Sequence, residues 1–517
     1  MNKKLCLILS FLISFTGCSF FNNNSENNSS NSSLISSTSN KESEKDSQSD
    51  RVEYIVKDNL KFVLNKNKKS YSVAGVAKEN LEEINIPSSV NSFPVTEVYE
   101  GAFMNQKSIK RVSFPDTLNE ISYQSFLGCE GIENIVIGEN VKIIGDSSFA
   151  NCANLKSISL PDSLEKILYG AFKNCYSLAS IEIPSKVRDI DFNTFENCYS
   201  LNSVVLSERL LTIGSEAFKN CGNLLSIKLP STLKLIDAGA FIGCNSLYEV
   251  YNESELKILK NNYNHGFVSY YARIIHNKNG TTSYRYNVET KIIDRDGFMF
   301  TQDEKNGYRL FKYVGSSSNI KLPSDVDGES YQIDSHAFYR SEAIINLDIP
   351  SFVKTIDVYT FANCINLKTV KINGAEYIKE SAFSECSNIE TITLPNTLKS
   401  IGKSAFSQCK KIKTLVIPEG VTNFEYCAFS HCLELEEVSL PSTLIEIGIG
   451  SFSHCKSLKT LVIPTSVTTI GVVAFYNCDN LYLFSELKSM PSGWDDVDRP
   501  VYFANEWEYV NGVPTVK

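Results

Sequence analysis

Apolar residues recur along this chain with a fixed period of 23 positions. Phenylalanines stand 23 residues apart from Phe103 to Phe241, and a second series runs from Phe338 to Phe475 with the same step except for one step of 22. A constant period of this kind indicates a repeat architecture, in which each unit is too small to bury its apolar face alone and stacks on its neighbours. The two series predict fourteen repeats in two blocks of seven.

The positions around each phenylalanine follow one pattern, A-F-x-x-C-x-x-L-x-x-I-x-I-P-x-x-V-x-x-I-G-x-x. Its L-x-x-I-x-I part, as in Leu155, Ile158 and Leu160, predicts a short strand, because period-2 alternation at its end directs Ile158 and Leu160 inward. The proline that follows in many repeats lacks a ladder donor and ends the strand. The cysteine is replaced only in the first repeat of each block, at Gln106 and Ser341, as expected of capping repeats.

This pattern resembles the BspA-like leucine-rich repeats of bacterial surface proteins. The resemblance rests on A-F-x-x-C, on L-x-x-I-x-I-P and on the 23-residue step, and it extends over most of the 517 residues. It implies a leucine-rich-repeat solenoid that is mostly β, with stacked parallel short strands joined by turns and short 3-10 or helical segments. For function, it implies a surface protein with an adhesive role, in a family whose partners vary.

The first residues read as an export signal. Two lysines precede an apolar stretch from Leu5 to Phe15, which is too short to span a bilayer as a helix. With the small residues before Cys18, the segment resembles a bacterial lipoprotein signal peptide, which implies that residues 1–17 are removed and that Cys18 carries the lipid. Phe15 departs from the leucine that this pattern prefers, and an ordinary secretory signal is the alternative. The Asn- and Ser-rich residues 18–50 predict a disordered tether.

The remaining boundaries follow from where the repeats begin and end. We expect an N-terminal β cap at residues 51–102 and a first repeat block at 103–252. An insertion with a second cap element follows at 253–337, then a second repeat block at 338–486 and a C-terminal cap at 487–517. The segments before the two blocks look like two copies of one starter element that closes the open end of a stack. Within the insertion, the apolar positions from Gly266 to His276 are compatible with a short helix.

The composition limits the chemistry of this chain. The formal net charge is −9 and no basic run occurs, so we expect no nucleic-acid partner and no membrane contact other than through the N-terminal lipid. Only five His and two Trp are present, and no phosphate-binding loop, serine-hydrolase or zinc-protease motif occurs. We therefore predict no catalytic residue, no cofactor and no enzymatic activity.

Most of the 15 cysteines belong to the repeat ladder. Stacked side chains point in parallel rather than at each other, so we expect free, packed thiols instead of disulfides or zinc ligands. Cys427 lies outside the ladder, two residues before Phe429, where other repeats carry polar residues. We therefore expect Cys427 to be exposed and to react first in the native protein.

Two further patterns hint at metal ions. His431 and His454 each precede a ladder cysteine, but other repeats place Asn or Gly there, so we interpret the position as a turn that requires left-handed backbone. The Asp-x-Asp-Gly segments that end at Gly297 and Gly328 hint at calcium, but neither extends to a full calcium loop, and Asp-Gly is mostly a turn signal. We predict no metal site.

The candidate binding residues are aromatic and lie in the insertion. Outward strand positions in the repeats are mostly Ser and Thr, which we interpret as a solvated face, with a hydroxyl ladder for glycans as the alternative. The insertion instead concentrates aromatic residues, which supply contact area at low entropic cost. These residues are Tyr263, Phe267, Tyr270, Tyr271, Tyr284 and Tyr286. They serve either for recognition or as a cover for the open apolar edges of neighbouring coils.

We predict from these features an exported, lipid-anchored protein at the cell membrane or cell surface. It binds a macromolecule, which is a host or cell-surface protein or a glycan, and it catalyses nothing. The alternative is a structural spacer or scaffold of a cell-surface assembly.

Overall fold

The computed structural model describes residues 53–517 apart from residue 261 and residues 285–288, 304–306, 495–496 and 498. The predicted signal peptide, the tether and Cys18 therefore lie outside the described residues. The described chain divides into two compact units, residues 53–395 and residues 396–517. The first unit holds the starter strands, the first repeat block, the insertion and the first coils of the second block. The second unit holds the remaining coils and the C-terminal segment.

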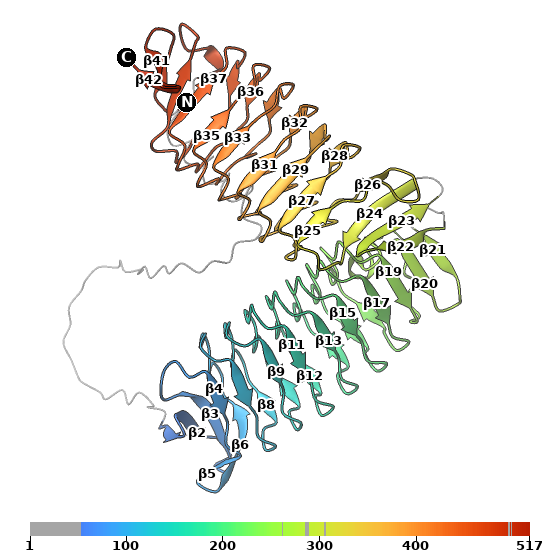
Figure 1. The fold of residues 1–517 in the computed structure, drawn as a ribbon. Coiled ribbons are helices and arrows are strands. Elements are labelled where there is room, and N and C mark those ends of the chain that lie inside the picture. Colours follow the sequence, from blue (N-terminus) through green and yellow to red (C-terminus); the bar gives the residue numbers. More distant parts are fainter. Residues whose placement is uncertain (1–52, 261, 285–288, 304–306, 495–496, 498) are drawn as a thin grey trace, which may run out of the picture. The chain divides into compact units, whose positions relative to one another are not determined.

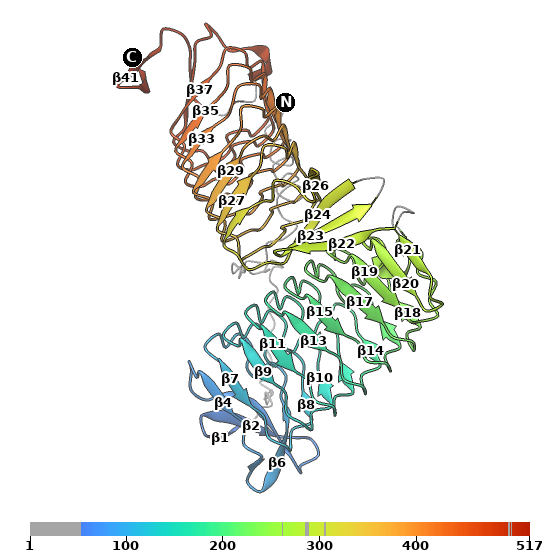
Figure 2. The same cartoon turned by 45° about the vertical axis from the view of Figure 1, so that its right-hand side comes forward.

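Each coil of the first block contributes one strand to each of two rows (Figures 1 and 2). The L-x-x-I-x-I segments form the first row: β7 (Arg111–Ser113), β9 (Asn134–Val136), β11 (Ser157–Ser159), β13 (Ser180–Glu182), β15 (Ser203–Val205), β17 (Ser226–Leu229) and β19 (Glu249–Asn252). The isoleucine before the next phenylalanine lies in the second row: β8 (Glu120–Ile121), β10 (Ile143–Ile144), β12 (Lys166–Ile167), β14 (Asp189–Ile190), β16 (Thr212–Ile213) and β18 (Leu235–Ile236).

Parallel pairing at a 23-residue offset joins equivalent residues of successive coils. Ile158 pairs with Ile135 in the first row, and Ile167 pairs with Ile190 in the second. The second row is hydrogen-bonded continuously through β18, whereas the first row pairs mostly in twos. The solenoid predicted from the period is therefore confirmed. The second row was not predicted, because two-residue strands are too short to show an alternation of apolar and polar positions.

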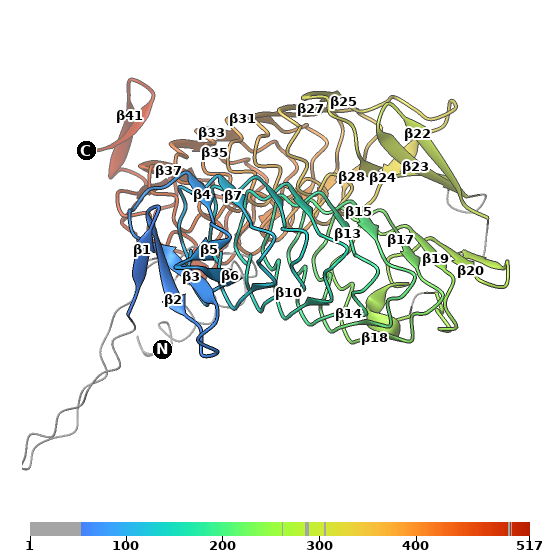
Figure 3. The same ribbon diagram turned by 90° about the horizontal axis from the view of Figure 1, so that it is seen from below.

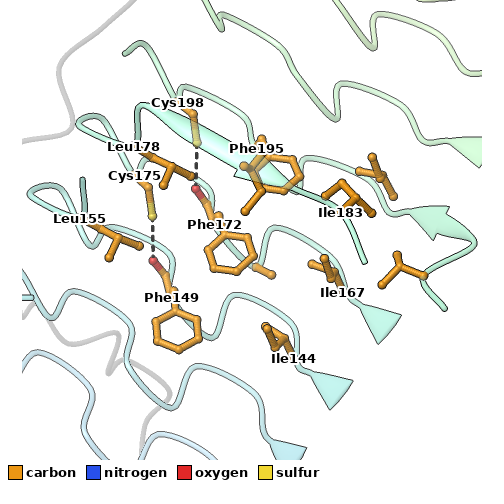
Figure 4. Close-up of a cluster of buried hydrophobic side chains, with 14 of the residues drawn as sticks. Ile144, Phe149, Leu155, Ile167, Phe172, Cys175, Leu178, Ile183, Phe195 and Cys198 are labelled. Carbon is orange, nitrogen blue, oxygen red and sulfur yellow. Dashed lines mark hydrogen bonds between the residues drawn. The ribbon is translucent and has the colours of Figure 1, made fainter. Parts of the chain in front are cut away.

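The core of this unit is a ladder of stacked phenylalanines. Phe149, Phe172 and Phe195 are fully buried, and the centroids of successive rings lie 5.7 Å and 5.5 Å apart. Figure 4 shows these rings beside Ile144 and Ile167, which come from the second row of strands. Burial of each phenylalanine contributes ~1.5–3 kcal/mol, and that contribution is available only when the next coil covers the ring.

Two starter elements with the same topology begin the two blocks. In each, three antiparallel strands are followed by a strand that pairs in parallel with the third of them. The first is β1 (Ile55–Lys57), β2 (Leu60–Leu64), β3 (Tyr71–Val76) and β6 (Phe93–Val98), with β4 (Glu83–Asn85) and β5 (Ser89–Val90). The second is β22 (Lys291–Arg295), β23 (Phe298–Asp303), β24 (Gly307–Tyr313) and β26 (Tyr331–Ile333), with β25 (Asn319–Lys321). This agrees with the expectation that one element occurs twice.

The helix expected between Gly266 and His276 is wrong. The only helical piece there is a single 3-10 turn, η1 (His265–Phe267), beside β18 (Figure 3), and Ile274–Asn277 forms strand β20, which pairs in parallel with β19. The N–H of Phe241 donates to the carbonyl of Gly266 at 2.7 Å, as the N–H of every other ladder phenylalanine of the first block does to the next coil. The described residues between 253 and 277 therefore form one further coil, and β21 (Thr282–Tyr284) then pairs with β20 as an antiparallel edge. Ile274–Asn277 forms a strand rather than a helix because the unpaired edge of β19 offers it backbone hydrogen-bond partners.

The first coils of the second block, still in the first unit, repeat this arrangement. Their strands are β27 (Asn346–Ile349), β28 (Thr355–Ile356), β29 (Thr369–Ile372), β30 (Tyr377–Ile378) and β31 (Thr391–Thr393). The single 22-residue step leaves the ladder intact, because Ile356 pairs with Ile378 and Val370 with Ile392. The missing residue is therefore absorbed in a turn.

The second unit, residues 396–517, has the same two rows of strands. They are β32 (Ser400–Ile401), β33 (Thr414–Val416), β34 (Asn423–Phe424), β35 (Glu437–Ser439), β36 (Glu446–Ile447), β37 (Thr460–Ile463), β38 (Thr469–Ile470) and β39 (Tyr482–Ser485). The C-terminal segment adds η2 (Ser492–Trp494), β40 (Val501–Tyr502), β41 (Trp507–Val510) and β42 (Val513–Val516). Trp494 is fully buried, and the indole N–H of Trp507 donates to the carbonyl of Ser485 at 3.1 Å. Among the described residues, no helix is long and apolar enough to cross a bilayer.

Candidate binding surfaces

The ladder cysteines are structural thiols. All thirteen cysteines in the described ranges are free and buried. Each thiol that hydrogen bonds along the ladder donates to the phenylalanine carbonyl one coil earlier, for example Cys175 to Phe149 at 3.2 Å and Cys198 to Phe172 at 3.3 Å (Figure 4). Burial raises the pKa of the Cys129 thiol to about 12, so it stays protonated. A protonated thiol is a poor nucleophile and a poor metal ligand. The prediction of free, packed thiols is confirmed by their burial without disulfides.

The expected exposure of Cys427 is wrong. Its side chain is 4% exposed, close to the values of the ladder cysteines. Its backbone φ of +54° matches that of Ser147 and Glu216 at the same repeat position. A side chain at this position lies beside the equivalent residue of the next coil, since a Cβ added at Gly450 would lie 3.0 Å from the Cys427 sulfur. The polar residues at this position in other repeats therefore do not indicate full exposure.

Asparagines form a second ladder along the first block. Asn174 donates its side-chain amide to Asn151, Asn197 to Asn174, and Asn220 to Asn197, at 2.7, 2.7 and 2.8 Å. All four residues have φ between 60° and 63°. The predicted left-handed turn position is therefore confirmed. The amide chain along it was not predicted, although asparagine at a 23-residue spacing was a visible signal for it.

The two histidines of the second unit occupy this same turn position. His431 and His454 have φ of 61° and 64°, and their rings stack with centroids 4.1 Å apart. Asn477 donates its amide to Nε2 of His454 at 2.9 Å, and the hydroxyl of Ser430 lies 2.7 Å from Nδ1 of His431. Burial, and secondarily the neighbouring His454, lowers the pKa of His431 to about 4. Both rings therefore belong to a ladder of neutral hydrogen-bonding groups, which confirms the turn interpretation.

The Asp-Gly segments are also turns. Asp294 accepts a hydrogen bond from the N–H of Gly297 at 3.0 Å, and Asp325 accepts one from Gly328 at 3.1 Å. Asp327 bonds the hydroxyl of Tyr308 and pairs with an arginine of the preceding turn. In the part of the chain that the structure describes, no group of three or more His, Cys, Asp or Glu side chains is placed to hold a metal ion.

The outward strand positions of the coils form a face of small side chains. Ser180 lies beside Ser203, and Thr369 beside Thr391, in register. Strands of the same row also expose valines, with Val136 70% and Val205 52% exposed. This face offers hydroxyls and methyl groups but few large anchors for a partner.

The aromatic residues of the insertion gather on the extra coil. Tyr263, Phe267, Tyr270 and Tyr271, which we call the insertion aromatic cluster, have neighbouring ring centroids 5.0–5.7 Å apart. Tyr263 is 63% exposed, whereas the other three rings are half-buried. The hydroxyl of Tyr271 accepts the N–H of Gly243 at 3.2 Å, which ties the cluster to the last regular coil.

The other two candidates lie elsewhere. Tyr284 is half-buried on β21, and Tyr286 is outside the described residues. A second aromatic surface was not predicted: Tyr169 and Phe192 stack at 5.3 Å on the turns of adjacent coils and are 39% and 40% exposed. The sequence pattern that could have indicated this surface is an aromatic residue three positions before each of two successive ladder phenylalanines.

Comparison with protein families assigns the repeats. The family described as "BspA type Leucine rich repeat region (6 copies)" matches residues 70–201, 166–269, 304–395 and 376–490, which together cover well over half of the chain. The chain belongs to the BspA-type leucine-rich repeat family. This assignment agrees with the coils described above, and it also includes most of both starter elements of this BspA-type protein.

Solved structures similar to this BspA-type chain are leucine-rich-repeat proteins. A leucine-rich cell surface protein of Faecalibacterium prausnitzii is 24% identical over 87% of this chain and 98% of its own, with a TM-score of 0.37. A leucine-rich repeat protein of Bacteroides ovatus is 25% identical over 80% of this chain and 95% of its own, with a TM-score of 0.35. The leucine-rich repeat protein of T. pallidum is 29% identical over 39% of this chain and 84% of its own, with a TM-score of 0.31. No curated protein matches this chain.

Proposed function

We propose that this BspA-type chain is an exported, lipid-anchored surface protein that binds a macromolecule through its insertion aromatic cluster and catalyses no reaction. Membership of the BspA-type family supports a role in binding. The observation that carries the site is the arrangement of Tyr263, which is 63% exposed and yet stacks on Tyr270 and meets Phe267 edge-on. Ordered aromatic surface is thus presented to solvent.

The residues of the cluster divide between covering the coil and facing solvent. Tyr271 is hydrogen-bonded to the last regular coil, as a cover for that coil requires. Tyr263 buries little of its own surface, so its exposed ring contributes little to the stability of the unit. Ordered aromatic rings lose little conformational entropy on binding and are enriched among the residues that dominate interfaces. A protein or a glycan of another cell or of a host is the class of partner that such a surface fits.

The titratable groups of the repeats favour binding over catalysis. The ladder thiols are held protonated by burial, and the stacked imidazoles of the second unit are held neutral. Nucleophilic and acid–base catalysis require groups that change protonation near the working pH. The repeats of this chain therefore supply a scaffold.

Substitution of the exposed Tyr263 and of its stacking partner Tyr270 tests the binding site. We expect the Tyr263→Ala, Tyr270→Ala variant to lose at least ten-fold in binding to intact cells or to an arrayed glycan, with a melting temperature within 2–3 °C of the wild type, because few buried contacts are removed. Tyr99→Ala is the matched control, since Tyr99 is 45% exposed on the same unit and far along the coil stack. Unchanged binding by the double variant refutes this site, and absence of any partner favours the spacer role.

The lipid anchor is tested separately. Wild-type protein is expected to partition into detergent with the membrane fraction, because a Cys18-linked lipid supplies the apolar anchor. Cys18→Ala protein is expected to accumulate as an uncleaved precursor. Mature protein free in the medium for both forms contradicts the lipoprotein assignment.

A structural spacer is the second candidate. It is favoured by the outward face of small serines, threonines and valines, which repeats along the coils without large anchors. A spacer needs length and stability only, so it predicts that shortening the stack by whole coils alters function while the aromatic cluster is dispensable.

A further inference from the structure

A cavity lies where the second starter element meets the first repeat block, inside the first unit. Phe311 on β24 packs edge-on against Tyr248 with centroids 5.0 Å apart, and the guanidinium of Arg340 lies 3.3 Å above the ring of Tyr199. Beside Arg340 the chain leaves a cavity of about 330 Å³. Its wall includes Lys312 from β24 and Asn223 from the first block. A space of this size lies at the lower end of ligand pockets in proteins.

Lys312 is the unusual group in this wall. The residue is 3% exposed, and its ammonium donates one hydrogen bond, to the side-chain oxygen of Asn223 at 2.7 Å. Within the described ranges, no carboxylate forms an ion pair with it and no second acceptor bonds it. An ammonium has three donors, so two of them lack a protein acceptor. Burial lowers the pKa of Lys312 to about 8, which leaves it mostly charged at neutral pH.

Other buried charges in the same unit are compensated. Glu196 pairs with Lys173 and Lys219, and Asp334 pairs with Arg273 and Arg309. A buried charge without a partner is costly, because desolvation is not repaid by a Coulombic attraction. Lys312 therefore differs from the other buried charged residues of its unit, each of which has a partner of opposite charge.

The rest of the cavity suits an anion. Arg340 places a second positive charge in the wall, and Ser200, Asn202 and Ser341 add hydroxyl and amide groups. Glu342 is the one carboxylate among the lining residues, and it is exposed rather than buried. The positive charges in this wall thus outnumber the negative ones.

We propose that this cavity binds a small anion, no larger than a monosaccharide, whose carboxylate, sulfate or phosphate oxygens accept hydrogen bonds from the Lys312 ammonium. The oxyanion fills the two remaining donors and supplies the missing counter-charge. Arg340 adds attraction, and the neighbouring hydroxyls and amides orient the remainder of the ligand. This site is separate from the insertion aromatic cluster and does not rest on the proposed function.

Thermal unfolding with three probes tests the site. Glucuronate, sulfate and phosphate are titrated against chloride at constant ionic strength. At least one is expected to raise the melting temperature of the wild type in a saturable manner, because a ligand that binds only the folded state stabilises it. Lys312→Met is expected to weaken the apparent affinity at least ten-fold. Without ligand, this variant should be as stable as the wild type or more stable, since it replaces an unpaired buried charge by an apolar chain of similar length.

Lys228→Met is the matched control, because Lys228 is an exposed lysine that forms surface ion pairs on the same unit. It is expected to retain the full ligand response. A direct measurement avoids any doubt about folding of a variant: the side-chain NMR titration of Lys312 in the wild type should shift to higher pH when the anion binds. Failure of all three anions to stabilise the wild type, an equal response in Lys312→Met, or an unshifted Lys312 titration overturns the proposal.

Discussion

The coils of residues 103–252 repeat the same contacts from coil to coil, whereas the described residues between 253 and 337 make most of their contacts only once. In the regular coils, phenylalanine stacks on phenylalanine, and the asparagine amide donates to the asparagine of the neighbouring coil. In the irregular segment, charges are paired across long sequence separations and aromatic rings remain open to solvent. The difference indicates that repeated positions provide most of the stability, whereas positions that occur once supply the side-chain arrangements on which both proposed binding sites rest.

The largest expected effect comes from breaking the phenylalanine ladder. Phe172→Ala is expected to destabilise the first unit by ~3–5 kcal/mol, because it removes a fully buried ring and leaves a cavity between two stacked neighbours. Phe267→Ala, in the half-buried insertion aromatic cluster, is expected to cost clearly less. Urea denaturation measures both variants. Equal losses contradict the division of roles between the two regions.

Removal of a single-occurrence charge is expected to rank second. Asp334 pairs with Arg273 and Arg309, and Asp334→Asn leaves both guanidiniums without a counter-charge. The expected cost is about 3 kcal/mol, the lower end for breaking a buried ion pair, because both arginines are partly exposed. Asp327→Asn is the control, because Asp327 pairs with Arg295 at an exposed site, where a salt bridge contributes less. The same denaturation measurement applies, and a comparable loss in both variants shows that burial of the Asp334 pair is unimportant.

The smallest expected effect concerns pH and the histidines of the second unit. Burial lowers the pKa of His431 from 6.5 to about 4, so the unfolded chain takes up a proton at a higher pH than the folded chain does. Stability that is present above pH 6.5 is therefore lost as the pH falls towards 4, by roughly 1 kcal/mol for this partly exposed ring. The double variant His431→Asn, His454→Asn places asparagine at these turn positions, as in the first block. It should remove this component of the pH dependence. An identical pH profile in wild type and variant refutes the assignment.

The success of prediction from the sequence differs between the two regions. The ladder positions of Phe and Asn are visible because each side chain contacts its own copy 23 residues away, and those of Cys are visible because each hydrogen-bonded thiol meets the phenylalanine carbonyl one coil earlier. The helix expected between Gly266 and His276 failed for the opposite reason: its apolar spacing suits a helix, but the open edge of β19 captured Ile274–Asn277 as a strand. The exposure expected for Cys427 failed because a single repeat does not reveal which side chains the next coil covers.

The sequence by itself determined the coil, its core ladder and its left-handed turn positions, because a periodic solenoid converts sequence spacing directly into spatial contact. Only the tertiary structure decided which residues that occur once come together. Lys312 meets Asn223 across 89 residues, and Asp334 meets Arg273 across 61. No shared period links these positions, and their contacts depend on where the second starter element packs against the side of the first block. This packing pairs the Asp334 carboxylate with arginines and leaves the Lys312 ammonium without a counter-charge.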